Sequence, residues 1–201
     1  MDKNEQLIMV VDREKLFKDF YFNGFCGYNQ FNFEKIILDN YYFIKRGIAE
    51  KDPSKKQPIA YTIVVKNKKI FVYQRPQSSK EHTDERLQHM FSWGIGGHID
   101  KSDEVGNPII NSLNRELKEE IGLEGKPKVI GYINDDTNEI GQVHFGILYM
   151  LETKKDVKPT SEELKTGSFM SLNEIEKLIK SGEKIETWST ISLSALKQIL
   201  S

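Results

Sequence analysis

The sequence reads Arg115-Glu116-Leu117-Lys118-Glu119-Glu120-Ile121-Gly122-Leu123 near the middle of the chain, and this stretch predicts the second half of an amphipathic helix. Asn107 is suited to cap the start of that helix, Pro108 to be its first residue and Gly122 to end it in a left-handed conformation. Apolar residues recur at helical spacing: Ile110, Leu113, Leu117 and Ile121. We therefore expect one helix over residues 108–121, with its apolar face against the core.

Another face of this helix is acidic. Glu116, Glu119 and Glu120 lie three and four positions apart, where like charges repel by about 0.2–0.5 kcal/mol per pair on an isolated helix. Arg115 can reach Glu119 and relieve part of that repulsion. A divalent cation would turn the repulsion into attraction, and clustered carboxylates suit Mg²⁺ or Mn²⁺. The helix taken alone favours a solvated acidic face, because charge runs on helices are common.

The loop before the helix contains Gly96-Gly97, and this context changes the interpretation. Together, the segment from Gly97 and the segment Arg115 to Leu123 resemble the Nudix box, whose pattern is G-x5-E-x7-R-E-U-x-E-E-x-G-U with U aliphatic. The second half matches at every fixed position. The first half departs from the pattern, because Gly97 lies 18 positions before Arg115 where the family has 14. The family's first Glu therefore has two candidate counterparts here, Asp103 and Glu104.

The resemblance extends outside the box. A strand that ends in Gln74-Arg75, an aromatic and glycine-rich entry to the motif, and Phe169 before a capped helix are similar to the Nudix layout. The resemblance covers residues 58–182. It implies an α/β fold, an α/β/α sandwich with a mixed β-sheet.

The resemblance also implies an activity. Nudix hydrolases cleave a diphosphate linkage in nucleoside diphosphate derivatives, by attack of water on phosphorus with Mg²⁺ or Mn²⁺ as cofactor. On this sequence, Glu119 and Glu120 would hold the ion together with the carbonyl of Gly97, and Glu116 would be the base or a further ligand. Arg115 would orient the carboxylates. Four other residues stay open as the base: Glu139, Glu152, Glu162 and Glu163.

Several other residues carry weaker signals. Arg75 and Arg86 are candidates to bind substrate phosphate, and surface or structural ion pairs explain them equally well. Two histidines, His98 and His144, lie near the expected site, where a structural hydrogen-bonding role is the simpler expectation. Core packing is likewise the simpler interpretation for three further residues: Trp93, Tyr132 and Cys26.

Composition limits the function classes. The chain has 201 residues and a net charge of -1, which argues against binding to extended nucleic acid. The longest apolar runs, residues 59–65 and 145–151, are too short for a membrane span, and the N-terminus lacks a signal-peptide pattern. A single cysteine fits a reducing compartment. We therefore expect a cytoplasmic protein, and the resemblance to the Nudix family implies a small phosphorylated substrate, a nucleotide derivative, as its partner.

The N-terminal part differs from the rest. Aromatic residues are concentrated between Phe17 and Phe43, and a polar run with two prolines, Pro53 and Pro58, follows. We place a boundary near residue 55, which gives an N-terminal extension over residues 1–54 and a main domain over residues 55–201. The aromatic content favours an extension that packs on the main domain and shapes either the substrate pocket or a homodimer interface.

The remaining elements follow from local patterns. Two apolar runs, residues 59–65 and 70–74, predict a hairpin with Asn67 at a positive-φ turn position. Further strands are expected at residues 128–133, 143–151 and 168–170. A helix capped by Ser171 and Glu174 should end near Gly182, and a last helix should cover residues 189–200.

Two other functions remain open. The longer loop and the missing first Glu are compatible with a Nudix-fold binding or regulatory module that has lost turnover. An isomerase of isoprenoid diphosphates shares the fold, but it would need a catalytic cysteine near the site, and Cys26 lies in the extension.

Overall fold

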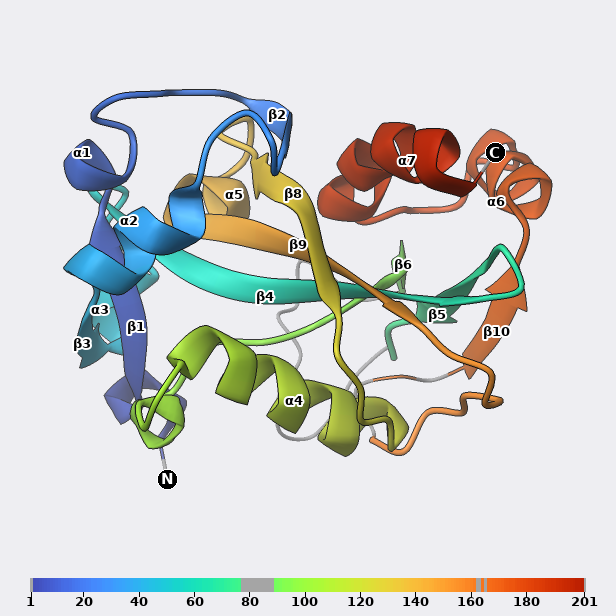
Figure 1. The fold of residues 1–201 in the computed structure, drawn as a ribbon, viewed down its shortest axis with the longest axis horizontal. Helices are drawn as coiled ribbons and strands as arrows, with labels where there is room; N and C mark the ends of the chain where they lie inside the picture. Colours follow the sequence, from blue (N-terminus) through green and yellow to red (C-terminus); the bar gives the residue numbers. More distant parts are fainter. Residues whose placement is uncertain (1, 77–88, 162–163, 165, 201) are drawn as a thin grey trace. The chain divides into compact units, whose positions relative to one another are not determined.

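The computed structural model describes residues 2–76, 89–161, 164 and 166–200, and strands and helices alternate along these residues (Figure 1). The strands are β1 (Leu7–Asp12), β2 (Gly24–Gly27), β3 (Tyr42–Lys45), β4 (Lys55–Lys66), β5 (Lys69–Gln74), β6 (Phe91–Ser92), β7 (Gly94–Ile95), β8 (Lys128–Asn134), β9 (His144–Glu152) and β10 (Thr166–Met170). The α-helices are α1 (Arg13–Leu16), α2 (Phe33–Asn40), α3 (Arg46–Ala49), α4 (Pro108–Ile121), α5 (Glu139–Val143), α6 (Leu172–Lys180) and α7 (Thr187–Leu200). Among the described residues, the 3₁₀ turns are η1 (Lys3–Glu5) and η3 (Lys101–Asp103). Within the described part of the chain, no helix combines the length and the apolar character needed to cross a membrane.

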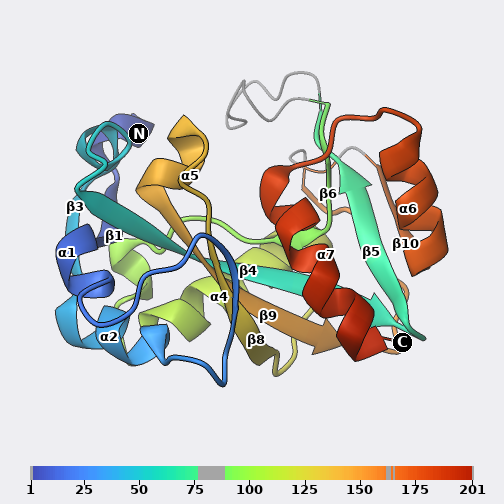
Figure 2. The same ribbon diagram turned by 90° about the horizontal axis from the view of Figure 1, so that it is seen from above.

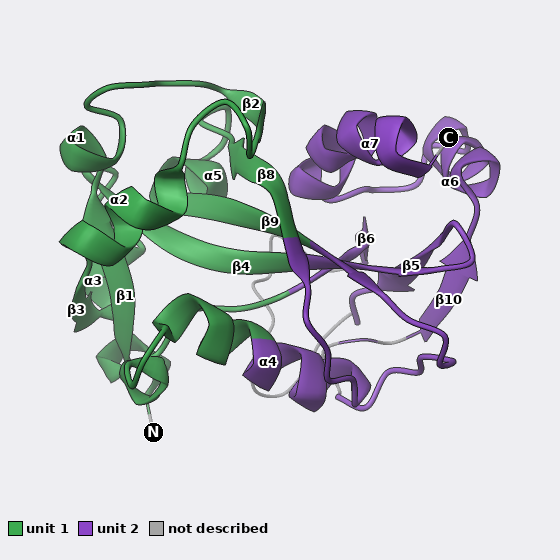
Figure 3. Ribbon diagram, viewed as in Figure 1, with its two compact units in different colours: residues 1–61, 96–113, 129–149 green, residues 62–95, 114–128, 150–201 purple. Residues whose placement is uncertain are grey.

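The chain folds into two compact units, each built from several segments (Figure 3). Unit 1 contains residues 1–61, 96–113 and 129–149, and unit 2 contains residues 62–95, 114–128 and 150–201. Three strands (β4, β8 and β9) and one helix (α4) continue from one unit into the other. This division follows contacts in space, whereas the predicted division at residue 55 follows the sequence, so the latter stays a prediction.

The sheet is mixed. Strands β4 and β5 are antiparallel, with Val65 opposite Ile70. Strands β4 and β9 run in the same direction, because their starts lie together and their ends lie together. At the starts, the ammonium group of Lys56 donates a hydrogen bond to the main-chain carbonyl of His144. At the ends, the main-chain N–H of Thr153, just after β9, donates to the carbonyl of Val65 in β4. Figure 2 shows the two arrows pointing the same way. The predicted mixed α/β fold is therefore confirmed.

Unit 1 contains the strand order β4-β9-β8-β2, and β1 pairs antiparallel with β3 and with the first residues of β4. Its core is aromatic. Phe33 is fully buried, and its ring centroid lies 5.0 Å from that of Tyr132 on β8 and 5.2 Å from that of Phe145 on β9. Phe17 packs edge-on against Phe145 at 5.9 Å. The aromatic N-terminal segment thus contributes to the same core as β8 and β9.

Unit 2 contains the strand order β10-β5-β4, and the β4–β5 hairpin turns through Asn67 and Lys68, whose φ angles are 50° and 59°. Asn67 therefore adopts the predicted positive φ. Helix α7 and the second half of α4 lie on opposite sides of these strands (Figure 3). Trp93, fully buried beside β6, donates its indole N–H to Ser192 of α7 at 3.0 Å.

Helix α4 has the predicted bounds. The side chain of Asn107 accepts hydrogen bonds from the main-chain N–H groups of Ile109 and Ile110, which satisfies donors that the first helical turn leaves unpaired. Gly122, with φ 63°, follows the last helical residue. The buried stripe is Ile109, Leu113, Leu117 and Ile121, so Ile109 takes the first buried position and Ile110 is half-buried.

The C-terminal helices also follow their predicted signals. Ser171 and Glu174 form a capping box at the start of α6, which ends at Lys180, and Gly182 has φ 83°. Helix α7 begins at Thr187, two residues before the expected start.

Candidate functional site

The acidic face of α4, defined as Glu116, Glu119 and Glu120, lies in unit 2. Its three carboxylates differ in how far they are exposed to solvent. The side chain of Glu119 is 60% exposed and that of Glu116 is 13% exposed, and Glu120 is buried. This short part of α4 therefore presents carboxylate oxygens both to solvent and to the interior.

Arg115 holds two of these carboxylates. Its Nη1 atom lies 2.6 Å from Oε1 of Glu116 and 3.5 Å from Oε2 of Glu119. A single guanidinium close to two carboxylates reduces their mutual repulsion and restricts their rotamers. The orienting role that the resemblance implies for Arg115 stays a prediction.

The pKa of Tyr73, on β5, is affected by the charge of Glu120. Burial is the main cause that raises the pKa of the Tyr73 phenol above its usual value; Arg75 opposes this effect, and the carboxylates of Glu120 and Glu186 add to it. The phenol therefore stays protonated, and it donates a hydrogen bond to the carbonyl of Gly94 at 2.7 Å. A neutral tyrosine adds no further negative charge beside Glu120.

Arg75 pairs with Glu186, a residue that the sequence analysis did not single out. Nη2 of Arg75 lies 3.8 Å from Oε1 of Glu186, and the guanidinium lies over the ring of Tyr73. Glu186 also accepts a hydrogen bond from the hydroxyl of Ser92. Of the two roles expected for Arg75, the ion pair is thus present. Glu186 precedes α7 without a motif around it, so only the folded chain identifies it.

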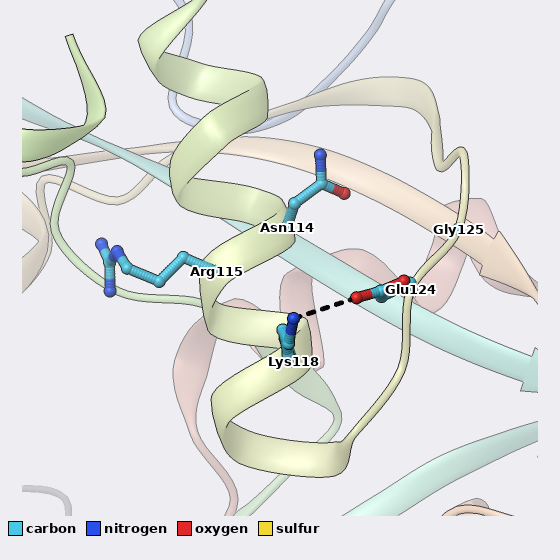
Figure 4. Close-up of a pocket in the computed structure, with 5 residues that line it drawn as sticks. All are labelled: Asn114, Arg115, Lys118, Glu124 and Gly125. Atoms are coloured by element: carbon cyan, nitrogen blue, oxygen red, sulfur yellow. Dashed lines mark ion pairs between the residues drawn. The ribbon is translucent and has the colours of Figure 1, made fainter. Parts of the chain in front are cut away.

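A shallow depression of about 430 Å³ lies beside the second half of α4 in unit 2 (Figure 4). Its lining residues are Asn114, Arg115, Lys118, Glu124 and Gly125. Lys118 and Glu124 form an ion pair across it at 3.3 Å, and both side chains are largely exposed. The depression is therefore open to solvent, and an ion pair spans it.

The glycine-rich loop of the motif lies in unit 1. At Gly96, a Cβ atom would lie 2.2 Å from the carbonyl oxygen of Ala60, so only glycine allows this approach to β4. The residues of the longer loop form the turn η3. The carboxylate of Asp103 is buried there and accepts a hydrogen bond from the main-chain N–H of Asp100 at 2.9 Å. Of the two candidates for the missing Glu, Asp103 therefore stabilises the loop through this hydrogen bond. Glu104 forms an exposed ion pair with Lys101.

A second group of titratable side chains lies in unit 1. Glu50 directly follows α3, His98 follows Gly97, and His144 begins β9. Their ligand atoms all lie within 4.8 Å of one another. Burial lowers the pKa of His144, and the charge of Glu50 opposes that shift. Both histidines are hydrogen-bonded as expected, but their convergence with Glu50 was not predicted. We call this group the Glu50–His98–His144 cluster.

The other predicted residues lie as follows. Trp93 and Tyr132 are fully buried and Cys26 is nearly so, which confirms core packing for all three, and burial raises the pKa of the Cys26 thiol. Glu139 is exposed in unit 1 and Glu152 is exposed in unit 2. Three predicted residues lie outside the described residues: Arg86, Glu162 and Glu163.

The donor chemistry of the acidic face fits a hard divalent ion. Its oxygens are all carboxylate oxygens, the ligands that Mg²⁺ and Mn²⁺ prefer. Across the described residues, these three carboxylates do not converge within 4.8 Å as the Glu50–His98–His144 cluster does. Mg²⁺ usually binds to one or two carboxylates and completes its shell with water and substrate phosphate, so this spacing suits an ion that binds together with substrate.

Comparison with known proteins gives a consistent family. The model of the NUDIX domain matches residues 56–188. Protein YmaB of Bacillus subtilis (strain 168) is 31% identical over 210 residues, which cover 98% of this chain and 100% of YmaB. The crystal structure of Tm1382, a protein assigned to the Nudix hydrolases, superimposes with a TM-score of 0.80 at 28% identity and covers 96% of this chain and 100% of Tm1382.

A more distant structure shares the fold. It is a bifunctional NMN adenylyltransferase/ADP ribose pyrophosphatase from Francisella tularensis, complexed with AMP and a Mn ion. It superimposes with a TM-score of 0.54 at 14% identity and covers 73% of this chain and 42% of that protein.

Proposed function

This chain belongs to the Nudix family, and from that premise we propose that it is a metal-dependent hydrolase that cleaves a diphosphate linkage in a nucleoside diphosphate derivative. One observation carries the proposal: Arg115, Glu116, Glu119 and Glu120 lie within two consecutive turns of α4, and the arginine contacts two of the carboxylates. The Francisella tularensis protein, whose described activity is on ADP ribose and whose structure contains AMP and a Mn ion, supports the ligand class.

Glu119 and Glu120 are the residues proposed to hold Mg²⁺ or Mn²⁺. Bound there, the ion would screen the negative charge of the diphosphate and make a nearby water more acidic. The exposed Glu119 faces solvent, from which ion and substrate arrive, and the buried Glu120 is fixed against the interior of unit 2. The carbonyl of Gly97, in unit 1, belongs to the proposal through the family resemblance alone.

Glu116 is the proposed base that takes the proton of the attacking water, or a further ligand. Its carboxylate accepts the hydrogen bond from Arg115 on Oε1. A positioned carboxylate of this kind contributes typically 10²–10⁴-fold as a general base. Arg115 acts through Glu116 and Glu119 and is therefore a positioning residue.

Three further residues complete the proposal. Arg75 and Arg86 are proposed to contact substrate phosphate. For Arg75, this contact would compete with its ion pair to Glu186. Glu152, exposed at the end of β9 in unit 2, remains the alternative base among the described residues of that unit.

A second candidate function is a binding module without turnover. The observation that favours it is the loop, in which Asp103 is buried and braces the turn η3 where the family pattern has a Glu at another spacing. The hydrolysis assay must therefore distinguish binding from turnover.

The test is a screen of the full-length chain against nucleotide sugars, dinucleoside polyphosphates, coenzymes and oxidised nucleotides, with Mg²⁺ or Mn²⁺. Released phosphate is measured with and without an added phosphatase, which separates diphosphate cleavage from direct phosphate release. We expect cleavage of at least one class and its loss in E120Q, with E124Q as a matched control on an exposed carboxylate. Ligand binding without any product would instead support the binding module.

A further inference from the structure

One carboxylate and two imidazoles converge in unit 1, where His98 directly follows Gly97 of the family motif. We propose that the Glu50–His98–His144 cluster binds a transition-metal dication of the Zn²⁺ class, with ligands other than the carboxylates of the acidic face of α4. Among the residues that the structure describes, it is the one set of three such side chains whose ligand atoms all lie within 4.8 Å of one another.

The spacing of the ligand atoms fits a single ion. The Nε2 atoms of His98 and His144 lie 3.1 Å apart, and Oε1 of Glu50 lies 3.6 Å from Nε2 of His98. Two ligand atoms about 2.1 Å from one Zn²⁺ at a tetrahedral angle lie about 3.4 Å apart. Oε1 of Gln57, a fully buried residue of β4, lies 2.8 Å from the same His98 nitrogen and offers a fourth ligand atom.

The hydrogen bonds of His144 fix which of its ring nitrogens can bind a metal. Nδ1 of His144 lies 2.7 Å from the main-chain carbonyl of Ile140, and a carbonyl only accepts, so this nitrogen carries the proton. Nε2 of His144 then presents its lone pair toward His98. Metal-binding histidines commonly donate the other ring N–H to a main-chain carbonyl in this way, which fixes the tautomer.

Nε2 of His98 has more acceptor atoms around it than a single N–H group can serve. Three acceptor atoms surround Nε2 of His98: Nε2 of His144, Oε1 of Gln57 and Oε1 of Glu50. A single N–H on His98 cannot point at all three acceptors. A dication between the two imidazoles and Glu50 interacts with every one of these lone pairs, including that of a deprotonated His98.

The ligand types select the class of metal. Imidazole nitrogen together with carboxylate suits Zn²⁺ and its neighbours in the first transition row, whereas Mg²⁺ prefers an all-oxygen octahedral shell. The cluster and the acidic face of α4 should therefore differ in metal preference. This difference makes the two sites separable by experiment.

The charges around the cluster are balanced. Nε of Arg46 lies 3.3 Å from Oε1 of Glu50 and competes with a cation for this carboxylate. Nζ of Lys56 donates to the carbonyl of His144 at 3.2 Å and to Asp136 at 2.8 Å. Burial lowers the pKa of Lys56 to about 8, so Lys56 is mainly protonated at pH 7 and offsets Asp136. Because Arg46 competes with a cation for Glu50, removing the charge of Arg46 should strengthen metal binding.

The ligands come from two parts of the chain. Glu50 lies in the predicted N-terminal extension, whereas His98 and His144 lie in residues 56–188, which the family model matches. A bound ion would cross-link these segments within unit 1. The effect we expect is stabilisation of unit 1.

The experiment measures Zn²⁺ binding to the full chain without an affinity tag, after removal of metal with a chelator, by competition with a chromophoric chelator. We expect one Zn²⁺ per chain, bound in the presence of excess Mg²⁺. Loss of a partner that only supports a ligand already costs about 10–100-fold in affinity, so H144Q and E50Q should weaken binding at least about 100-fold. R46Q should strengthen it by about fivefold, the effect of removing a partly exposed competing charge.

A matched control is the double variant E119Q/E120Q, which should keep the Zn²⁺ affinity of the original chain. Zn²⁺ should also raise the thermal midpoint of the original chain and not that of E50Q, whose partly exposed side chain makes a folding defect from the substitution itself small. If H144Q does not fold, E50Q and R46Q still decide the question. Absence of Zn²⁺ binding, equal affinity in E50Q and the original chain, or loss of binding in E119Q/E120Q would each overturn the proposal.

Discussion

The acidic face of α4 and the Glu50–His98–His144 cluster are assembled in opposite ways. The acidic face places three carboxylates within five consecutive residues of one helix, so a single local structure sets their spacing. The cluster takes its three ligands from the end of α3, the segment after β7 and the start of β9, and its two histidines are 46 positions apart. The first set is visible as a sequence pattern, and the second exists only in the folded chain.

The two regions also differ in how closely their ligand atoms approach. The cluster brings its atoms together without help from a substrate, while the three carboxylates of α4 are spread from solvent to interior. This contrast suggests a general distinction: a site that turns over a phosphorylated substrate leaves coordination positions for that substrate, and a site that stabilises a fold closes its shell with protein atoms. The following predictions test whether the two regions behave independently.

The largest expected effect follows deletion of residues 1–52. It removes Glu50 from the cluster and also removes Phe17, Phe22 and Phe33 from the aromatic core of unit 1, where each buried ring contributes roughly 1.5–3 kcal/mol. We expect the truncated chain to aggregate or to lose cooperative unfolding in a thermal melt. A truncated protein that stays soluble, keeps its thermal midpoint and oligomeric state, and hydrolyses the same substrate would show that the extension is a separate module.

The next effect concerns Asp136, the counter-ion of Lys56, which in turn donates a hydrogen bond to the main-chain carbonyl of His144. Burial alone would raise the pKa of Asp136, but hydrogen bonds from Arg13 at 2.5 Å and Lys56 at 2.8 Å outweigh burial and lower this pKa well below its usual range. Because D136N leaves the buried Lys56 without its counter-ion, we expect a loss of about 3–5 kcal/mol in the free energy of unfolding at pH 7. Denaturant unfolding measures it.

The same pair predicts a pH dependence. A carboxyl group whose pKa is lower in the folded state contributes stability above its unfolded pKa, near 3.8, and this contribution disappears as the pH falls toward the folded pKa. The original chain should therefore lose more stability than D136N between about pH 5 and pH 2. Parallel stability curves for the two proteins over that range would contradict the assignment.

A third prediction separates the regions directly. A metal ion supplies several kcal/mol of charge stabilisation and about 1.4 kcal/mol corresponds to a factor of ten in rate, so E119Q should lower hydrolysis on the order of 100-fold or more. H144Q should leave the Mg²⁺ concentration for half-maximal rate unchanged. K118Q, on the same turn of α4, serves as the surface control. If E119Q retained full activity at limiting Mg²⁺, the metal assignment on α4 would be wrong.

The last prediction concerns how the effect of E116Q divides between catalytic rate and metal affinity. If Glu116 is the base, E116Q should lower the catalytic rate by about 10²–10⁴-fold and change the apparent Mg²⁺ affinity far less. The rate of the original enzyme should rise from neutral toward alkaline pH, because the attacking water must lose a proton. Equal losses of rate and metal affinity in E116Q would make Glu116 a ligand, and an acid optimum would contradict the mechanism.

Much of the main domain was predictable because its signals are local. The β4–β5 turn follows from Asn67 and helix α6 from its capping box, since each signal acts within about four residues of the element it defines. The N-terminal strands β1 and β3 were not predicted. They are short, and they exist through pairing with each other and with β4.

Helix α4 was predictable from the sequence, because capping, apolar spacing and the order of Arg115, Glu116, Glu119 and Glu120 are all set within four turns of one helix. The folded chain was needed to bring Glu50, His98 and His144 together, to pair Arg75 with Glu186 and to let Asp103 accept a hydrogen bond within the longer loop. The two groups of features differ in the range of the interactions that form them. A helix forms hydrogen bonds between residues four apart, whereas these side chains meet only after sheet pairing and core packing have brought distant segments of the chain together.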